Sequence, residues 1–205
     1  MFDAKLKLVI DPFLVQSGKI CLRLGLTANM LTVTGFVIGL CCGLLIYAEA
    51  YNWALVALLL SRICDGLDGA VARLSQPTDF GGYLDIVCDF LFYAFVPFCF
   101  ALSHPEQAAA AAFLMLSFVG TGTSFLAYAI LDAKQKAGNV LQHKRTKSFA
   151  YLGGLTEGTE TIAVFALILL YPAYFTALAL VFGFLCWLTT GYRVYVTWVE
   201  FAKDS

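Results

Sequence analysis

Charged residues are scarce in this chain of 205 residues: Asp, Glu, Lys and Arg make up 13% of it, and hydrophobic types make up 60%. Soluble domains carry about 25% charged residues, so the composition excludes an ordinary soluble globular domain. It predicts an all-α integral membrane protein instead. The net charge of −1 indicates no partner by itself, and we expect no nucleic-acid partner.

The Cys-x-x-Cys spacing of metal and redox sites is also absent. The seven cysteines lie mostly in apolar segments. We therefore expect them to act as small buried hydrophobic side chains rather than as disulfides or metal ligands.

Long apolar segments dominate the rest of the chain. There are six, at about 30–48, 53–73, 81–102, 108–131, 150–170 and 174–196. Each is close to the roughly 20 residues that a helix needs to cross a bilayer. We predict a single domain over residues 1–205, with a core of six transmembrane helices in residues 27–205.

Residues 1–26 mix lysines and arginine with apolar side chains. This pattern favours an amphipathic helix lying in the headgroup plane, although a charged leader before the first span is the alternative.

Lys and Arg are missing from three of the expected loops, 49–52, 103–107 and 171–173. If the N-terminus is cytoplasmic, every basic residue of the other loops and the termini lies on the cytoplasmic side. The positive-inside rule therefore predicts this orientation, in a prokaryotic inner membrane.

Four aspartates interrupt the second and third apolar segments. Asp65 and Asp68 are three residues apart and Asp85 and Asp89 are four apart, so each pair lies on one face of a helix. Pro77 marks a turn between the two segments. Antiparallel helices around this turn would place Asp65 level with Asp89, and Asp68 level with Asp85.

Such a group of carboxylates needs a compensating charge. Each one near the centre of a membrane helix costs roughly 2.5–3.5 kcal/mol. Hard divalent cations such as Mg²⁺ bind carboxylates together with the phosphate oxygens of a substrate. We therefore predict that all four aspartates are metal ligands, on the cytoplasmic side.

The same stretch resembles a known signature, Asp-x-x-Asp-Gly-x-x-Ala-Arg, a spacer, then Gly-x-x-x-Asp-x-x-x-Asp. This is the signature of the CDP-alcohol phosphatidyltransferases. Every fixed position is filled, by Asp65, Asp68, Gly69, Ala72, Arg73, Gly81, Asp85 and Asp89. The spacer from Arg73 to Gly81 is one residue shorter than the family pattern, and a loop tolerates this difference.

The resemblance implies a reaction. A substituted phosphate would pass from a CDP-alcohol, most often CDP-diacylglycerol, to a small hydroxyl acceptor, with release of CMP, in phospholipid biosynthesis. It also implies Mg²⁺ or Mn²⁺ as two ions per site, Asp89 as the catalytic base, and a homodimer.

Residues that would contact the CDP-alcohol follow from the same resemblance. Asn29 and Thr32 fit a nucleotide-proximal segment of the family in which Ala28 replaces a proline, although Asn29 or Thr27 could instead cap a helix. The full expected set is Asn29, Thr32, Asp65, Gly66, Asp68, Gly69, Ala72, Arg73, Thr78 and Gly81.

Acceptor contacts are less specific. Arg145 and Lys147 lie in a basic loop that could guide an anionic substrate, or could only follow the positive-inside bias and attract anionic lipids. Glu157 lies in a glycine-rich polar stretch that could bind the acceptor or could be a capped helix start. This stretch lacks the lysines that resemblance to phosphatidylglycerophosphate synthases would require, which counts against glycerol 3-phosphate.

Two other interpretations compete with the transferase. An intramembrane prenyltransferase also uses aspartates and Mg²⁺, and a divalent-cation transporter could use the aspartates as its ion site. Two arginines lie within the apolar segments. Such residues usually face a cavity or a partner. We expect Arg62 to pair with Asp65 or to contact phosphate, while for Arg193, near the end of its segment, extension to the membrane surface is the alternative.

Overall fold

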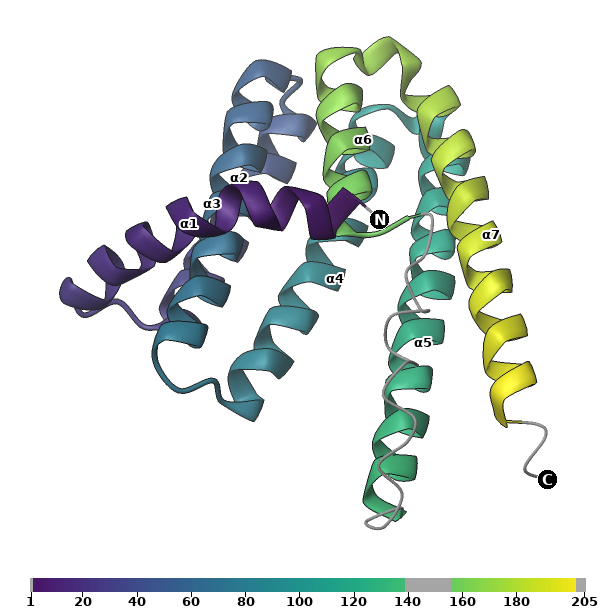
Figure 1. Ribbon diagram of the computed structural model, residues 1–205. Helices are drawn as coiled ribbons and strands as arrows, with labels where there is room; N and C mark the ends of the chain where they lie inside the picture. Colours follow the sequence, from purple (N-terminus) through teal and green to yellow (C-terminus); the bar gives the residue numbers. More distant parts are fainter. Residues whose placement is uncertain (1, 139–155, 202–205) are drawn as a thin grey trace.

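A computed structural model describes residues 2–138 and 156–201 of the chain, and these residues form helices with no strand (Figure 1). The long helices are α1 (Phe2–Arg23), α2 (Ala28–Tyr47), α3 (Tyr51–Leu74), α4 (Asp79–Ser103), α5 (Ala108–Gly138), α6 (Gly158–Leu170) and α7 (Phe175–Phe201). Short 3₁₀ helices, η1 (Pro105–Gln107) and η3 (Pro172–Tyr174), precede α5 and α7. The predicted all-α class is confirmed.

The predicted apolar segments correspond to helices α2 to α7. Of these, α2, α4, α5 and α7 are long and apolar enough to cross a membrane. Helix α3 has 24 residues but carries the charged residues of the signature, and α6 has 13 residues. The sixfold span count therefore remains a prediction. Helix α6 begins at Gly158 rather than near residue 150, and residues 150–155 lie outside the described ranges.

Threonines cap α2 and α4, the helices before and after α3 in the chain. The hydroxyl oxygen of Thr27 accepts a 3.3 Å hydrogen bond from the Met30 amide at the start of α2. That of Thr78 accepts a 3.0 Å hydrogen bond from the Gly81 amide at the start of α4. These bonds satisfy amides that have no partner within the helix.

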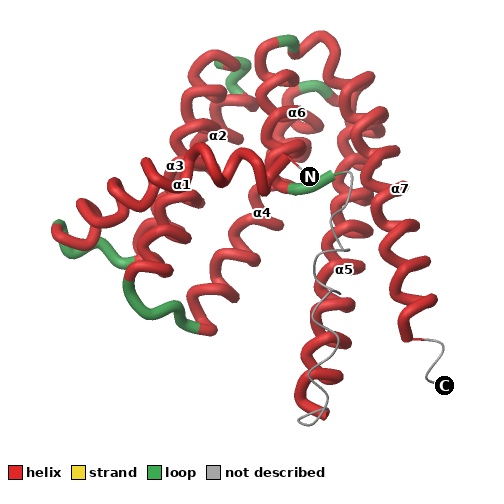
Figure 2. Tube along the Cα trace, in the orientation of Figure 1, coloured by secondary structure: helices red, strands yellow, loops and turns green. Residues whose placement is uncertain are grey.

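Helix α2 holds the acidic stretch together because it packs along both α3 and α4. The α3 and α4 backbones stay apart from each other, which leaves room between them for side chains. Helix α5 packs against α7 and α4 (Figure 2). The core between these helices is aromatic, and Phe92 and Phe118 each meet Phe165 edge-on, with ring centroids 6.3 and 6.1 Å apart.

Helix α1 crosses the bundle at a steep angle to the other helices (Figure 1). It contacts α3 where small residues permit close approach: a Cβ at Gly66 would lie 3.3 Å from Leu14, and a Cβ at Gly18 would lie 3.2 Å from Leu74. The predicted N-terminal helix is thus present. Its position in the headgroup plane stays a prediction.

Candidate active site

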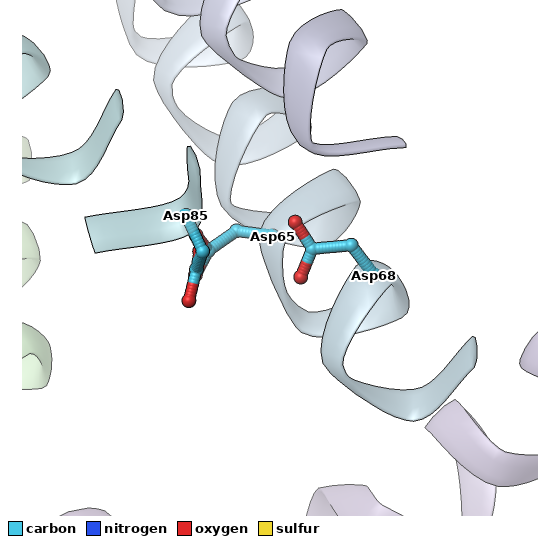
Figure 3. Close-up of side chains that lie close together, drawn as sticks. All are labelled: Asp65, Asp68 and Asp85. Atoms are coloured by element: carbon cyan, nitrogen blue, oxygen red, sulfur yellow. The ribbon is translucent and has the colours of Figure 1, made fainter. Parts of the chain in front are cut away.

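Three of the four aspartates face one another across the gap between α3 and α4 (Figure 3). One carboxylate oxygen from each of Asp65, Asp68 and Asp85 lies within 4.8 Å of the others. Asp65 and Asp68 come from successive turns of α3, and Asp85 comes from the second turn of α4. The convergence predicted from the three- and four-residue spacings is therefore present for these three side chains.

Asp68 is fixed by a partner from a different helix. The hydroxyl group of Thr32, on α2, donates a 2.6 Å hydrogen bond to Oδ2 of Asp68. Both side chains are buried, with exposed fractions of 7% and 5%. A short hydrogen bond to a carboxylate in such surroundings restricts its orientation. Thr32 therefore lies beside the aspartates with Asp68 as its partner, and its contact with the CDP-alcohol stays a prediction.

The fourth aspartate, Asp89, borders a small pocket together with the other three and is bonded to an arginine. Nη1 of Arg62 donates a 2.8 Å hydrogen bond to Oδ1 of Asp89, and the same nitrogen lies 3.6 Å from Oδ1 of Asp65. The expected pairing of Arg62 is therefore confirmed, but its shorter bond is to Asp89. The carboxylates of Asp65 and Asp89 both approach this nitrogen. This agrees with the prediction that antiparallel helices place the two residues at the same height.

A cavity of about 490 Å³ opens beside the three aspartates. It lies among the α1–α2 loop, the start of α2, the last turns of α3 and the start of α4. Seven of the predicted donor-binding residues line it: Asn29, Thr32, Asp68, Gly69, Ala72, Thr78 and Gly81. Asp85 lines it as well, so the cavity reaches the carboxylates directly.

Both capping threonines, Thr27 and Thr78, line this cavity, so the N-termini of α2 and α4 meet there. Helix N-termini carry a partial positive charge and attract anions such as phosphate. Gly81 is also needed for space, because a Cβ there would lie 3.0 Å from Oδ1 of Asn29. The cavity thus combines carboxylates on one wall with anion-attracting helix ends on another.

Three predicted donor contacts lie elsewhere. Asp65 borders a small pocket deeper in the bundle, together with Arg62 and Asp89. Gly66 faces α1, and Arg73 is more than half exposed and forms a 3.3 Å ion pair with Asp11 of α1. An exposed pair of this kind contributes roughly 0–1 kcal/mol, so it does not fix Arg73 in place.

A second, smaller cavity of about 130 Å³ lies among α4, α5, α6 and α7. Glu157, predicted to contact the acceptor, lines it just before α6, where its amide donates a 3.1 Å hydrogen bond to Glu160. The predicted acceptor contacts Arg145 and Lys147 lie outside the described residues.

Arg193 lines the same cavity, as expected for an arginine inside an apolar segment, and not the membrane surface, which was the alternative. The residue is only 8% exposed, and its Nη1 donates a 3.0 Å hydrogen bond to the carbonyl oxygen of Thr121. It therefore faces the interior rather than the membrane surface, because α5 offers it a carbonyl that the sequence does not reveal. An arginine inside an apolar segment was the available signal for a functional position.

The carboxylates of Asp65, Asp68 and Asp85 fit a hard divalent cation. Their donor set is entirely oxygen, and the adjoining cavity leaves space for further oxygen ligands from a substrate. The residues of this chain therefore suit a Mg²⁺- or Mn²⁺-dependent phosphate chemistry.

Comparison with known proteins decides the family. The model of the CDP-alcohol phosphatidyltransferases matches residues 25–201. The chain belongs to this family. The resemblance expected from the eight signature residues is thereby confirmed, and family membership favours the transferase over the prenyltransferase and the cation transporter.

One relative of this CDP-alcohol phosphatidyltransferase matches almost its whole length, and another matches about half of it. It is 50% identical over 196 residues to inner membrane protein YnjF of Escherichia coli, covering 95% of this chain and 94% of that protein. It is 35% identical over 100 residues to archaetidylinositol phosphate synthase of Pyrococcus horikoshii, covering 48% of this chain and 53% of that one.

The fold is shared with a phosphatidylinositol phosphate synthase of Mycobacterium tuberculosis whose crystal structure contains bound CDP-DAG. The TM-score is 0.68 at 17% identity, over 90% of this chain and 93% of that one. Membership of the family makes the protein an integral membrane enzyme of CDP-alcohol phosphatidyl transfer in phospholipid synthesis, and its apolar helices agree with this.

Proposed function

We propose that this enzyme transfers the phosphatidyl group of CDP-diacylglycerol to a small hydroxyl acceptor and releases CMP. The observation that carries this proposal is the juxtaposition of Asp65, Asp68 and Asp85 with the cavity of about 490 Å³. A cavity of this size suits a nucleotide headgroup, since ligand sites commonly measure about 300–1,000 Å³. The acyl chains need no pocket of their own, because they can stay in the bilayer.

Two helix N-termini and, through metal ions, three aspartates would bind the diphosphate of the donor. The N-termini of α2 and α4 offer partial positive charge to its oxygens. Asp65, Asp68 and Asp85 would hold one or two Mg²⁺ or Mn²⁺ ions, which when bound neutralise diphosphate charge and polarise the phosphorus centre. Thr32 keeps the Asp68 carboxylate turned toward this position through its 2.6 Å hydrogen bond.

Asp89 is the proposed general base. The acceptor oxygen forms a bond to the phosphorus that carries the diacylglycerol group, the bond from that phosphorus to the CMP phosphate oxygen breaks, and the acceptor's proton passes to Asp89. Among the described residues, Arg62 hydrogen-bonds Asp89 through Oδ1. We therefore assign the proton to Oδ2. A positioned base of this kind contributes about 10²–10⁴ to the rate.

The acceptor is proposed to approach from the second cavity, beside Glu157 and Arg193. This cavity also contains Phe90 and Tyr93, which neighbour Asp89 on α4. Its volume of about 130 Å³ suits a compound of few atoms. Arg193 and Glu157 both line this cavity, so we infer that the polar groups of the acceptor bind between a cation and a carboxylate.

The test is a direct assay of the purified protein in mixed micelles with CDP-diacylglycerol and Mg²⁺ or Mn²⁺. We expect acceptor-dependent release of CMP, with the lipid product identified by mass spectrometry against serine, inositol, inositol phosphate, glycerol 3-phosphate and choline. Asp89→Asn should give a folded protein that does not turn over. Turnover retained in that variant would rule out Asp89 as the base.

The cellular arrangement forms part of the same proposal: an inner-membrane homodimer with its N-terminus and active site cytoplasmic. In support, the α3–α4 turn and the ends of α5 and α7 lie at one end of the molecule, while the connections between α2 and α3 and between α6 and α7 lie at the other (Figure 1). Reporter fusions to the C-terminus should be active only as cytoplasmic reporters.

A further inference from the structure

We propose that Arg62 is the positioning residue for Asp89, and that it keeps this carboxylate out of the group formed by Asp65, Asp68 and Asp85. The inference rests on the proposed function, because it gives a reason why one of four neighbouring aspartates acts as a base rather than as a metal ligand. It starts from a difference in contacts: oxygens of Asp65, Asp68 and Asp85 lie within 4.8 Å of one another, whereas Asp89 borders a pocket with them and is bonded to an arginine.

Arg62 is itself held in a fixed place. Its side chain is 15% exposed, and its guanidinium carbon lies 4.6 Å from the ring centroid of Phe92, which is fully buried. Nη2 donates a 3.1 Å hydrogen bond to the hydroxyl of Ser61, and this hydroxyl donates a 2.8 Å hydrogen bond to the carbonyl oxygen of Gly35. A planar guanidinium supported on its face and at one nitrogen can direct its other nitrogen with little freedom.

The other nitrogen, Nη1, contacts Asp89. Its hydrogen bond to Oδ1 of Asp89 measures 2.8 Å, whereas the distance to Oδ1 of Asp65 is 3.6 Å, longer than a hydrogen bond. The Asp89 side chain is 27% exposed, so it can still reach an incoming acceptor. The arginine therefore orients one oxygen of Asp89 and leaves the carboxylate accessible.

The same charge opposes a divalent cation nearby. A fixed cation 3.6 Å from a metal-binding carboxylate repels a second cation at that carboxylate. Removing Arg62 should therefore have two effects of opposite sign: turnover falls because Asp89 loses its orientation, and metal affinity rises because the repulsion is gone and Asp89 can join the other aspartates. A residue needed only for folding would lower both.

The experiment compares wild type with Arg62→Met and Arg62→Lys in detergent, after checking that each elutes as a single species. Mn²⁺ affinity is measured by electron paramagnetic resonance without substrate, and turnover at saturating Mn²⁺. For Arg62→Met we expect turnover to fall by at least about tenfold and Mn²⁺ to bind about two- to tenfold more tightly. Arg62→Lys should have turnover and Mn²⁺ affinity between those of wild type and Arg62→Met, because lysine keeps the charge but lacks the planar guanidinium.

Turnover of Arg62→Met within about twofold of wild type, or unchanged or weaker Mn²⁺ binding, overturns the proposal. If Arg62→Met does not fold, Ser61→Ala and Arg62→Lys provide the test. Ser61→Ala removes the hydrogen bond to Nη2, so it should lower turnover and leave Mn²⁺ affinity unchanged. Full turnover in both variants overturns the proposal. If the wild type uses no CDP-alcohol at all, the proposed function fails. In that case the Mn²⁺ affinity alone tests the effect of Arg62 on cation binding.

Discussion

Thr32 and Asp68, 36 residues apart in the sequence, share a buried hydrogen bond of 2.6 Å that ties α2 to the acidic face of α3. Removing it with Thr32→Val should lower metal affinity or activity by about 10- to 100-fold, as loss of a partner that orients a metal ligand usually does. Thr32→Ser retains the hydroxyl and serves as the control. Equal activity of the valine and serine variants would show that the hydrogen bond is not needed.

Each aspartate facing the shared position should be indispensable. Asn in place of Asp65, Asp68 or Asp85 removes a negative ligand, so we expect turnover to fall by more than about 100-fold. Asp79→Asn is the matched control, because Asp79 is exposed in the first turn of α4 and does not line the cavity. It should retain wild-type turnover.

Chelation should reproduce the loss without any mutation. Wild-type protein treated with EDTA should release no CMP, and excess Mg²⁺ or Mn²⁺ should restore the activity. Turnover that survives EDTA would argue against a metal-dependent reaction.

Gly39 supports the site through packing. A Cβ at this position would lie 2.7 Å from a ring carbon of Phe92, the residue beneath the guanidinium of Arg62. Gly39→Ala should therefore cost about 1–3 kcal/mol of stability, visible as a lower thermal unfolding temperature in detergent, and should also reduce turnover. Gly191→Ala, where a Cβ meets nothing within 4 Å, should change stability by less than about 0.5 kcal/mol.

Arg193 should affect one substrate only. Arg193→Lys keeps the charge but loses the reach to the Thr121 carbonyl, so we expect the KM for the acceptor to rise by about tenfold or more while the KM for CDP-diacylglycerol stays unchanged. Steady-state kinetics with each substrate varied in turn provides the test. An equal rise in both KM values would mean that the variant disturbs the whole bundle rather than the acceptor site.

The sequence predicted the acidic group well because its information is local. Spacings of three and four residues and one turn at Pro77 place Asp65, Asp68 and Asp85 on facing helices, whatever the rest of the bundle does. The contributions of Thr32 and Arg193 depend instead on which helix packs beside which. Spacing along one helix cannot show that α2 brings Thr32 to Asp68, or that α5 presents a carbonyl oxygen to Arg193.

Hydropathy alone also did not predict where α6 begins. The composition of residues 150–170 indicates an apolar segment, but the helix begins at Gly158, where Glu157 and Glu160 form a capping box. Polar residues that look like the entrance of a span therefore lie beside a cavity instead.

The two capped helix ends at the larger cavity carry their charge on peptide groups. A backbone N–H survives every substitution except proline, so side-chain scanning would underestimate this part of the proposed nucleotide site. Apart from Gly81, which is needed for space, residues around those ends can therefore vary while the proposed binding of a diphosphate persists. Homologues with dissimilar sequences at this rim could then accept the same donor.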